Sequence, residues 1–138
     1  MASIFTQIMQ GKLPGHFVWE DDVAVAIMTI QPLKPGHILV IPREEIDHWD
    51  DLSPEQISHL MQVSQTLTRA LKMVFNPERV GVVIAGLEVP HTHIHLFPVN
   101  QLSDFDFSKA RMAESSELAD LAKKITQALQ SIQIPEKN

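Results

Sequence analysis

The sequence predicts an α+β fold in which an antiparallel sheet of about five strands packs beside one long helix. Short apolar runs fall into two groups, one before residue 45 and one after residue 78. A long segment with apolar residues at helical spacing separates the groups, and a second such segment lies near the end of the chain. Strands that follow one another in groups, instead of alternating with helices, are typical of antiparallel sheets.

The first part of the chain supplies a short helix and three strands. Ser3 is suited to cap a helix over residues 4–10, and Gly11 ends it. The expected strands are apolar runs bounded by Gly, Pro or Asp, namely residues 17–20, 23–28 and 37–41. The polar residues 43–52 that follow are expected to be irregular.

The long helix carries the clearest local signal. Ser53 is suited to cap it, Pro54 to occupy its first position, and Gln56 to complete a capping box. Asn76 and Pro77 end the run. Its apolar residues recur at helical spacing: Ile57, Leu60, Met61, Leu67, Leu71 and Val74. We interpret this stripe as the face that packs on the core.

The rest of the chain predicts two more strands and a terminal helix. The strands are residues 79–85 and 91–97, joined by a tight loop over 86–90. Apolar positions at helical spacing predict an amphipathic helix over 118–132. The length of 138 residues fits one domain, residues 1–138.

Three histidines at a spacing of two are the most informative feature of the chain. In an extended strand alternate side chains share a face, so we expect His91, His93 and His95 to project together over a cleft. Thr92 and Ile94 then face the core. Imidazole titrates near neutral pH and can act as a nucleophile, an acid or base, or a metal ligand. The row therefore indicates a catalytic or metal-binding site.

Two interpretations of this row stay open at the level of the residues. The imidazoles can act directly on a substrate, or they can hold zinc or iron with Glu88 as the nearest carboxylate. The absence of cysteine removes thiolate ligands and fits a cytoplasmic protein. The net charge of −6 argues against a nucleic-acid partner, and no apolar run suggests a signal peptide or a membrane span.

The row and its surroundings resemble the histidine triad (HIT) family of nucleotide hydrolases and transferases. The blocks that carry the resemblance are residues 3–8, 20–26, 35–42, 86–90 and the row itself. It covers about residues 3–99, followed by a helical extension over about 108–133. The resemblance implies a HIT-like fold with short terminal helices.

By this resemblance the protein is a metal-independent nucleotide hydrolase without a cofactor. His93 is expected to attack the α-phosphorus and form a nucleotidyl-histidine intermediate, while the backbone carbonyl of His91 fixes its tautomer. His95 is expected to bind a phosphate oxygen and pass a proton to the leaving group. His37 is expected to brace the side chain of His91. The positions where some members carry zinc-binding cysteines are Ser3 and Thr6 here.

The resemblance also assigns a nucleotide pocket. Apolar residues at base-contacting positions are Ile4, Phe5, Ile8, Ile27 and Ile30. Thr29 stands where many members have an aspartate that reaches the ribose, and Gly86 lies in the loop near the α-phosphate. Glu88 stands in that loop where many members have Ser or Thr, and its charge is expected to repel phosphate. These departures admit a third possibility, a nucleotide binder with little turnover.

The resemblance leaves the leaving group open. Phosphoramidates, dinucleoside polyphosphates and nucleotide sugars all stay open as substrates of this chain. A homodimer is expected, in which residues after about 100 reach the pocket of the neighbouring subunit.

Overall fold

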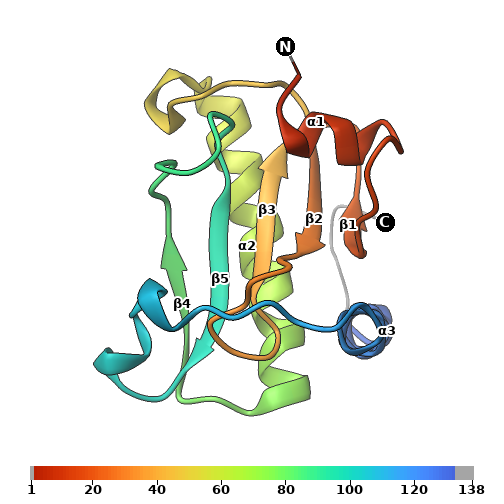
Figure 1. The fold of residues 1–138 in the computed structure, drawn as a ribbon, viewed down its shortest axis with the longest axis vertical. Helices are drawn as coiled ribbons and strands as arrows, with labels where there is room; N and C mark the ends of the chain where they lie inside the picture. The colour runs from red at the N-terminus through yellow and green to blue at the C-terminus, as the bar shows by residue number, and fades with distance from the viewer. Residues whose placement is uncertain (1, 133–138) are drawn as a thin grey trace.

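The computed structural model describes residues 2–132 and centres on a five-stranded sheet (Figure 1). Its strands are β1 (Phe17–Glu20), β2 (Ala24–Met28), β3 (Ile38–Pro42), β4 (Arg79–Val83) and β5 (Ile94–Val99). The helices are α1 (Ile4–Met9), α2 (Pro54–Phe75) and α3 (Ser115–Gln130). Three short 3₁₀ helices are η1 (Trp49–Asp51), η2 (Leu102–Asp104) and η3 (Phe107–Lys109). Met1 and residue 133, the end of the predicted extension, lie outside the described residues.

The sheet has the strand order β1-β2-β3-β5-β4, and every neighbouring pair is antiparallel. The α+β prediction is therefore confirmed. Strand β5 lies between β3 and β4, so it joins the two groups of strands seen in the sequence. Its partner β3 places Leu39 opposite His95 and Ile38 opposite Leu96. This register brings the end of the histidine row beside His37, the residue that precedes β3.

One face of the sheet packs on α2 and α3 and forms the main core. Alternate strand residues point to this face, because successive side chains of a strand alternate. The strand residues in this core are Val18, Ala24, Ala26, Met28, Ile38, Val40, Ile94 and Leu96. Helix α2 contributes Leu60, Leu67 and Leu71 of its predicted apolar stripe, and α3 contributes Leu118 and Ile125. Met61 of the predicted stripe is instead 42% exposed.

The opposite face of the sheet carries a smaller core and the histidines. Phe5 of α1 covers an apolar cluster formed by Val25, Ile27, Leu39 and Ile41. His37 and His95 lie on this second face, because each is one residue away from a residue of the main core. His37 and His95 therefore lie on the face of the sheet opposite α2, the helix that Figure 1 shows behind the sheet.

The predicted starts of α1 and α2 are confirmed in atomic detail, whereas α3 begins at Ser115, before the predicted residue 118. The Ser53 side chain accepts from the Gln56 amide, and the Gln56 side chain accepts from the Ser53 amide, which completes the capping box. Asn76 ends α2 in the left-handed conformation, with φ of 50°. At α1 the Ser3 hydroxyl accepts from the Thr6 amide. Among the described helices, none is both long enough and apolar enough to cross a membrane.

Candidate active site

A cavity of about 430 Å³ opens on the histidine face. Its size lies within the range of about 300–1,000 Å³ that is usual for small-molecule sites. The residues that line it come from the loop after β2, the loop after β4, the histidine row and the segment after η2: Thr29, Gln31, His37, Val83, Ala85, Gly86, Leu87, Glu88, His93, His95, Phe107 and Ala110.

His93 is held in one tautomer by the backbone. Its Nδ1 lies 2.7 Å from the carbonyl oxygen of His91. A carbonyl can only accept, so Nδ1 carries the proton and Nε2 keeps a free lone pair. The ring is buried and packs edge-on against Phe5, with 4.9 Å between the ring centroids. The arrangement presents a basic nitrogen in a fixed orientation at a residue that lines the cavity.

His91 does not line the cavity with His93 and His95, although its ring packs edge-on against Phe5, as the His93 ring does. Strand β5 begins only at Ile94, because the chain turns before it: the His91 amide donates to the Val89 carbonyl at 2.8 Å. The His91 ring is instead buried away from the cavity. Its Nε2 donates to the Pro42 carbonyl at 2.8 Å, and its Nδ1 accepts from the Ser3 hydroxyl at 2.7 Å.

The expectation that His37 braces His91 is also wrong, because the partner of His37 is His95. The two rings meet with 2.9 Å between Nε2 of His37 and Nδ1 of His95. The Leu33 amide donates to Nδ1 of His37 at 3.0 Å, so the His37 proton lies on Nε2. His37 then donates to Nδ1 of His95, and the proton of neutral His95 lies on Nε2. The cavity is thus lined by an imidazole acceptor, His93, and an imidazole donor, His95.

Burial keeps these imidazoles neutral. It lowers the pKa of His37 to about 3 and that of His95 to about 4, with a smaller contribution from the charge of neighbouring histidines. Burial also lowers the pKa of His93, and the hydrogen bond to the His91 carbonyl offsets part of this shift by raising the pKa. At pH 7 all three rings therefore carry one proton each, as the hydrogen bonds require.

The segment after β5 closes one side of the cavity. Phe107 packs edge-on against His95, with 5.0 Å between the ring centroids. The segment is fixed at both ends: Asp104 pairs with Lys34 at 2.9 Å, and the Ala113 amide donates to the Ile30 carbonyl at 2.9 Å. The sequence predicted that residues after about 100 reach a neighbouring subunit. In this structure they line the cavity of their own chain.

Comparison with known proteins agrees with this geometry. The family model described as the HIT domain matches residues 10–102, which include His37 and the whole histidine row. The chain belongs to the HIT family. An uncharacterized HIT-like protein of Borreliella burgdorferi is 33% identical over 77% of this chain and 81% of its own length. An adenosine 5'-monophosphoramidase of Saccharomyces cerevisiae is 32% identical over 70% of this chain and 62% of its own.

Solved HIT structures share the fold. A crystal structure of a Hit-like protein from Bartonella henselae covers 91% of this chain and 95% of its own, with a TM-score of 0.81 and 27% identity. The segment that carries Phe107 lies after the residues that the HIT domain model matches. This wall of the cavity is therefore built by a part of the chain that the family pattern does not specify.

The residues assigned to the nucleotide pocket by the HIT resemblance fall into two sets. Thr29, Gly86 and Glu88 line the cavity. The apolar positions do not: Phe5 and Ile27 are buried in the smaller core, Ile8 packs against it, and Ile4 and Ile30 are exposed. Contact of these apolar residues with a base stays a prediction. Sequence reasoning missed Phe107, since a single phenylalanine beyond the HIT motifs gives no functional signal.

The metal interpretation of the row requires imidazole nitrogens that converge on one point. His91 uses both ring nitrogens for Ser3 and Pro42, so the three histidines do not form such a set. Within residues 2–132, no group of three or more His, Asp or Glu side chains is arranged to hold a metal ion. The geometry thus favours direct chemistry by imidazole over a metal centre built on this row.

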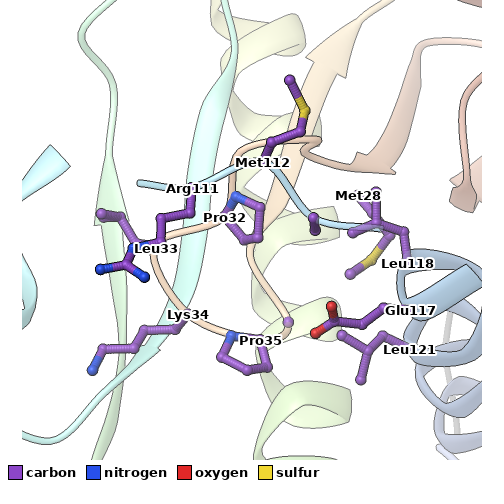
Figure 2. A pocket seen from close by; sticks show the side chains of 12 residues that line it. Met28, Pro32, Leu33, Lys34, Pro35, Arg111, Met112, Glu117, Leu118 and Leu121 are labelled. Carbon is purple, nitrogen blue, oxygen red and sulfur yellow. The ribbon is translucent and has the colours of Figure 1, made fainter. Parts of the chain in front are cut away.

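A second, smaller cavity of about 170 Å³ lies on the other side of the loop after β2 (Figure 2). Its walls are mainly Pro32, Pro35, Met112 and residues of α3 such as Leu118, and histidine is not among its described lining residues. We therefore place the HIT chemistry in the larger cavity.

Proposed function

We propose that this HIT protein hydrolyses a nucleotidyl substrate through a covalent intermediate on His93. The observation that carries the proposal is the 2.7 Å hydrogen bond between Nδ1 of His93 and the His91 carbonyl. An imidazole can attack through one nitrogen only if the other holds the proton, and this bond meets that condition. Nε2 of His93 is the nucleophile.

The first step forms a bond between Nε2 of His93 and the α-phosphorus and breaks the bond from phosphorus to the leaving group. His95 passes the proton on its Nε2 to the leaving group, so the leaving group departs neutralised, and the charge that the His95 ring loses balances the positive charge that the His93 ring gains. His37 keeps that proton in place by donating to Nδ1 of His95. Water then attacks the phosphorus, the bond between phosphorus and Nε2 of His93 breaks, and one proton of the water returns to His95 as the nucleoside monophosphate leaves. Substrate and water are the only reactants consumed.

The relative from Saccharomyces cerevisiae supports this reaction class, because its name describes hydrolysis of a nucleotidyl bond. The structure supports the same reaction class through the relative positions of His93 and His95. The nucleophile and the proton donor have ring centroids 4.9 Å apart, so one phosphate can contact both. Fixed position and orientation are the main demands of transfer at phosphorus.

Turnover of a substrate panel tests the proposal. Adenosine phosphoramidate, a diadenosine polyphosphate and a nucleotide sugar are offered to the wild type, with and without EDTA, and to His93→Ala. His48→Ala is the matched control, since the His48 side chain is 72% exposed. We expect EDTA-resistant hydrolysis of at least one substrate by wild type and control, and none by His93→Ala. Binding without hydrolysis of the whole panel, or activity restored only by zinc, contradicts the proposal.

A further inference from the structure

We infer that Glu88 selects the leaving group by charge, so that the cavity favours nucleoside phosphoramidates whose leaving amine carries a second, cationic group. The same charge disfavours polyphosphate leaving groups. This inference rests on the proposed function and names a substrate class for it.

The first support is the set of charges around the cavity. Among its described lining residues Glu88 alone has a formal charge, and Lys or Arg does not occur. Two cations of nearby loops are engaged elsewhere. Lys34 pairs with Asp104 at 2.9 Å, and Arg43 donates to the Asp21 carbonyl at 2.6 Å. Within the described part of the chain, Glu88 has neither an ion-pair nor a hydrogen-bond partner.

The second support is that the histidines do not offset this carboxylate. Burial lowers the pKa of His37, His93 and His95, so their rings are neutral at pH 7. The negative charge of Glu88 raises the pKa of His93, whereas burial lowers it. The electric field of Glu88 therefore acts on the nucleophile. A second or third phosphate therefore enters a cavity of negative potential that has no cationic side chain among its described lining residues.

The loop after β4 directs Glu88 to the cavity. Gly86 has φ of +73°, a conformation that favours glycine, and the turn it permits leads into Leu87 and Glu88. Leu87 and Glu88 are both exposed, and both line the cavity with His93 and His95. A leaving group that takes its proton from His95 therefore departs into the cavity that this carboxylate lines. An ammonium group at the far end of that leaving group would complement it.

A matched pair of leaving groups isolates the charge. Adenosine phosphoramidates of putrescine and of pentylamine have leaving groups of similar length, but only putrescine ends in an ammonium. In both cases the P–N bond breaks and the amine nitrogen receives the proton of His95, so the reaction chemistry is shared. Exposed ion pairs change affinities by about 1.5- to 5-fold, and we expect the wild type to prefer the putrescine substrate in kcat/KM by that factor.

Three variants separate charge from shape. Glu88→Gln should bring the ratio of the two kcat/KM values close to one, and Glu88→Lys should invert it and raise the relative rate on diadenosine tetraphosphate. Glu78→Gln removes an equal charge from an exposed residue just before β4 and should keep the wild-type ratio. Raising the ionic strength to about 1 M should move the wild-type ratio toward one, since the Debye length falls to about 3 Å.

The outcomes distinguish this inference from the proposed function. Hydrolysis of both phosphoramidates with the same ratio in the wild type and Glu88→Gln overturns the role of Glu88 and leaves the proposed function standing. A wild-type ratio of the two kcat/KM values that stays the same at high ionic strength also overturns the role of Glu88 and leaves the proposed function standing. If the wild type hydrolyses the nucleotide sugar alone, this inference fails and the proposed function stands. If it hydrolyses no substrate of the panel, both fail. Far-ultraviolet circular dichroism and the thermal unfolding midpoint show that each variant is folded.

Discussion

The Nε2 atom of His37 lies 2.9 Å from Nδ1 of His95, and the Leu33 amide determines which of the two donates. Together with the His91 carbonyl that holds the proton of His93, this means that backbone groups fix the tautomers of both cavity imidazoles. A nucleophile with a free lone pair and a proton donor then coexist at neutral pH without any ring being charged.

Loss of the His37 side chain should slow turnover without abolishing it. In His37→Ala the His95 proton is free to move to Nδ1, so the donor toward the leaving group is lost for part of the time. We expect kcat to fall by about two to four powers of ten, the usual contribution of acid–base assistance. His37→Gln, which can still donate from its side-chain amide, should recover part of this loss. An equal loss in both variants, at unchanged thermal stability, would show that donation by His37 is not its role.

The pH dependence of stability follows from the lowered pKa of His37 and His95. Both are neutral in the folded protein down to about pH 3 and 4, but titrate near 6.5 when unfolded. Between these values the unfolded chain binds more protons, so the stabilisation is complete above pH 6.5 and is lost as the pH falls, at up to about 1.4 kcal/mol per pH unit for each group. Urea unfolding at pH 7 and pH 5 should show a smaller decrease for His37→Gln than for the wild type.

Thr29→Asp should increase the preference for ribonucleotides over deoxyribonucleotides. Thr29 lines the cavity, and its hydroxyl accepts from the Gln31 amide at 3.3 Å. A neutral hydroxyl is a weaker acceptor for the ribose than a carboxylate. A carboxylate that accepts from ribose hydroxyls makes charge-assisted bonds worth about 1.5–3 kcal/mol each. Calorimetry with AMP and deoxy-AMP on both proteins measures the change. An unaltered ratio would mean that the sugar is held elsewhere.

We predict that the protein is a homodimer that extends its sheet across β4. Strand β4 is an edge of the sheet, and its Val82 is 46% exposed. Unpaired edges are usually covered or paired. Light scattering at micromolar concentration should give twice the mass of 15.5 kDa, and Val82→Asp should shift the protein toward the monomer by placing two carboxylates at the joint. A monomeric wild type would contradict this prediction, and His48→Asp controls for added charge.

The sequence was most informative where local rules apply. The capping box of α2 and the apolar face of β5 follow from short-range patterns, and the structure confirms both. The orientation of His91 could not be predicted, because it depends on contacts with Ser3 and Pro42, which are far away in the sequence. Side chains alternate between the two faces only in a regular strand, and the regular part of β5 begins at Ile94.

The same limit explains the missed wall of the cavity. The segment 100–113 has no regular secondary structure beyond two short 3₁₀ helices, so periodicity says nothing about where it lies. Its position depends on the Lys34–Asp104 pair and on the fit of Phe105 above Gly81, where an added Cβ would come within 2.7 Å of the Phe105 ring. Such long-range fits are visible only in the folded chain.

The central claim is that His93 forms a bond to phosphorus, and intact-protein mass spectrometry after a rapid quench without acid tests it most directly. The wild type mixed with a turned-over adenosine phosphoramidate should gain the mass of one adenylyl group, and peptide mapping should place that group on His93. His95→Ala should accumulate more of the adduct if it slows the second step more than the first. His93→Ala should gain no mass and show no turnover while keeping the wild-type fold. An adduct on another residue, or substantial turnover by His93→Ala, would contradict the account.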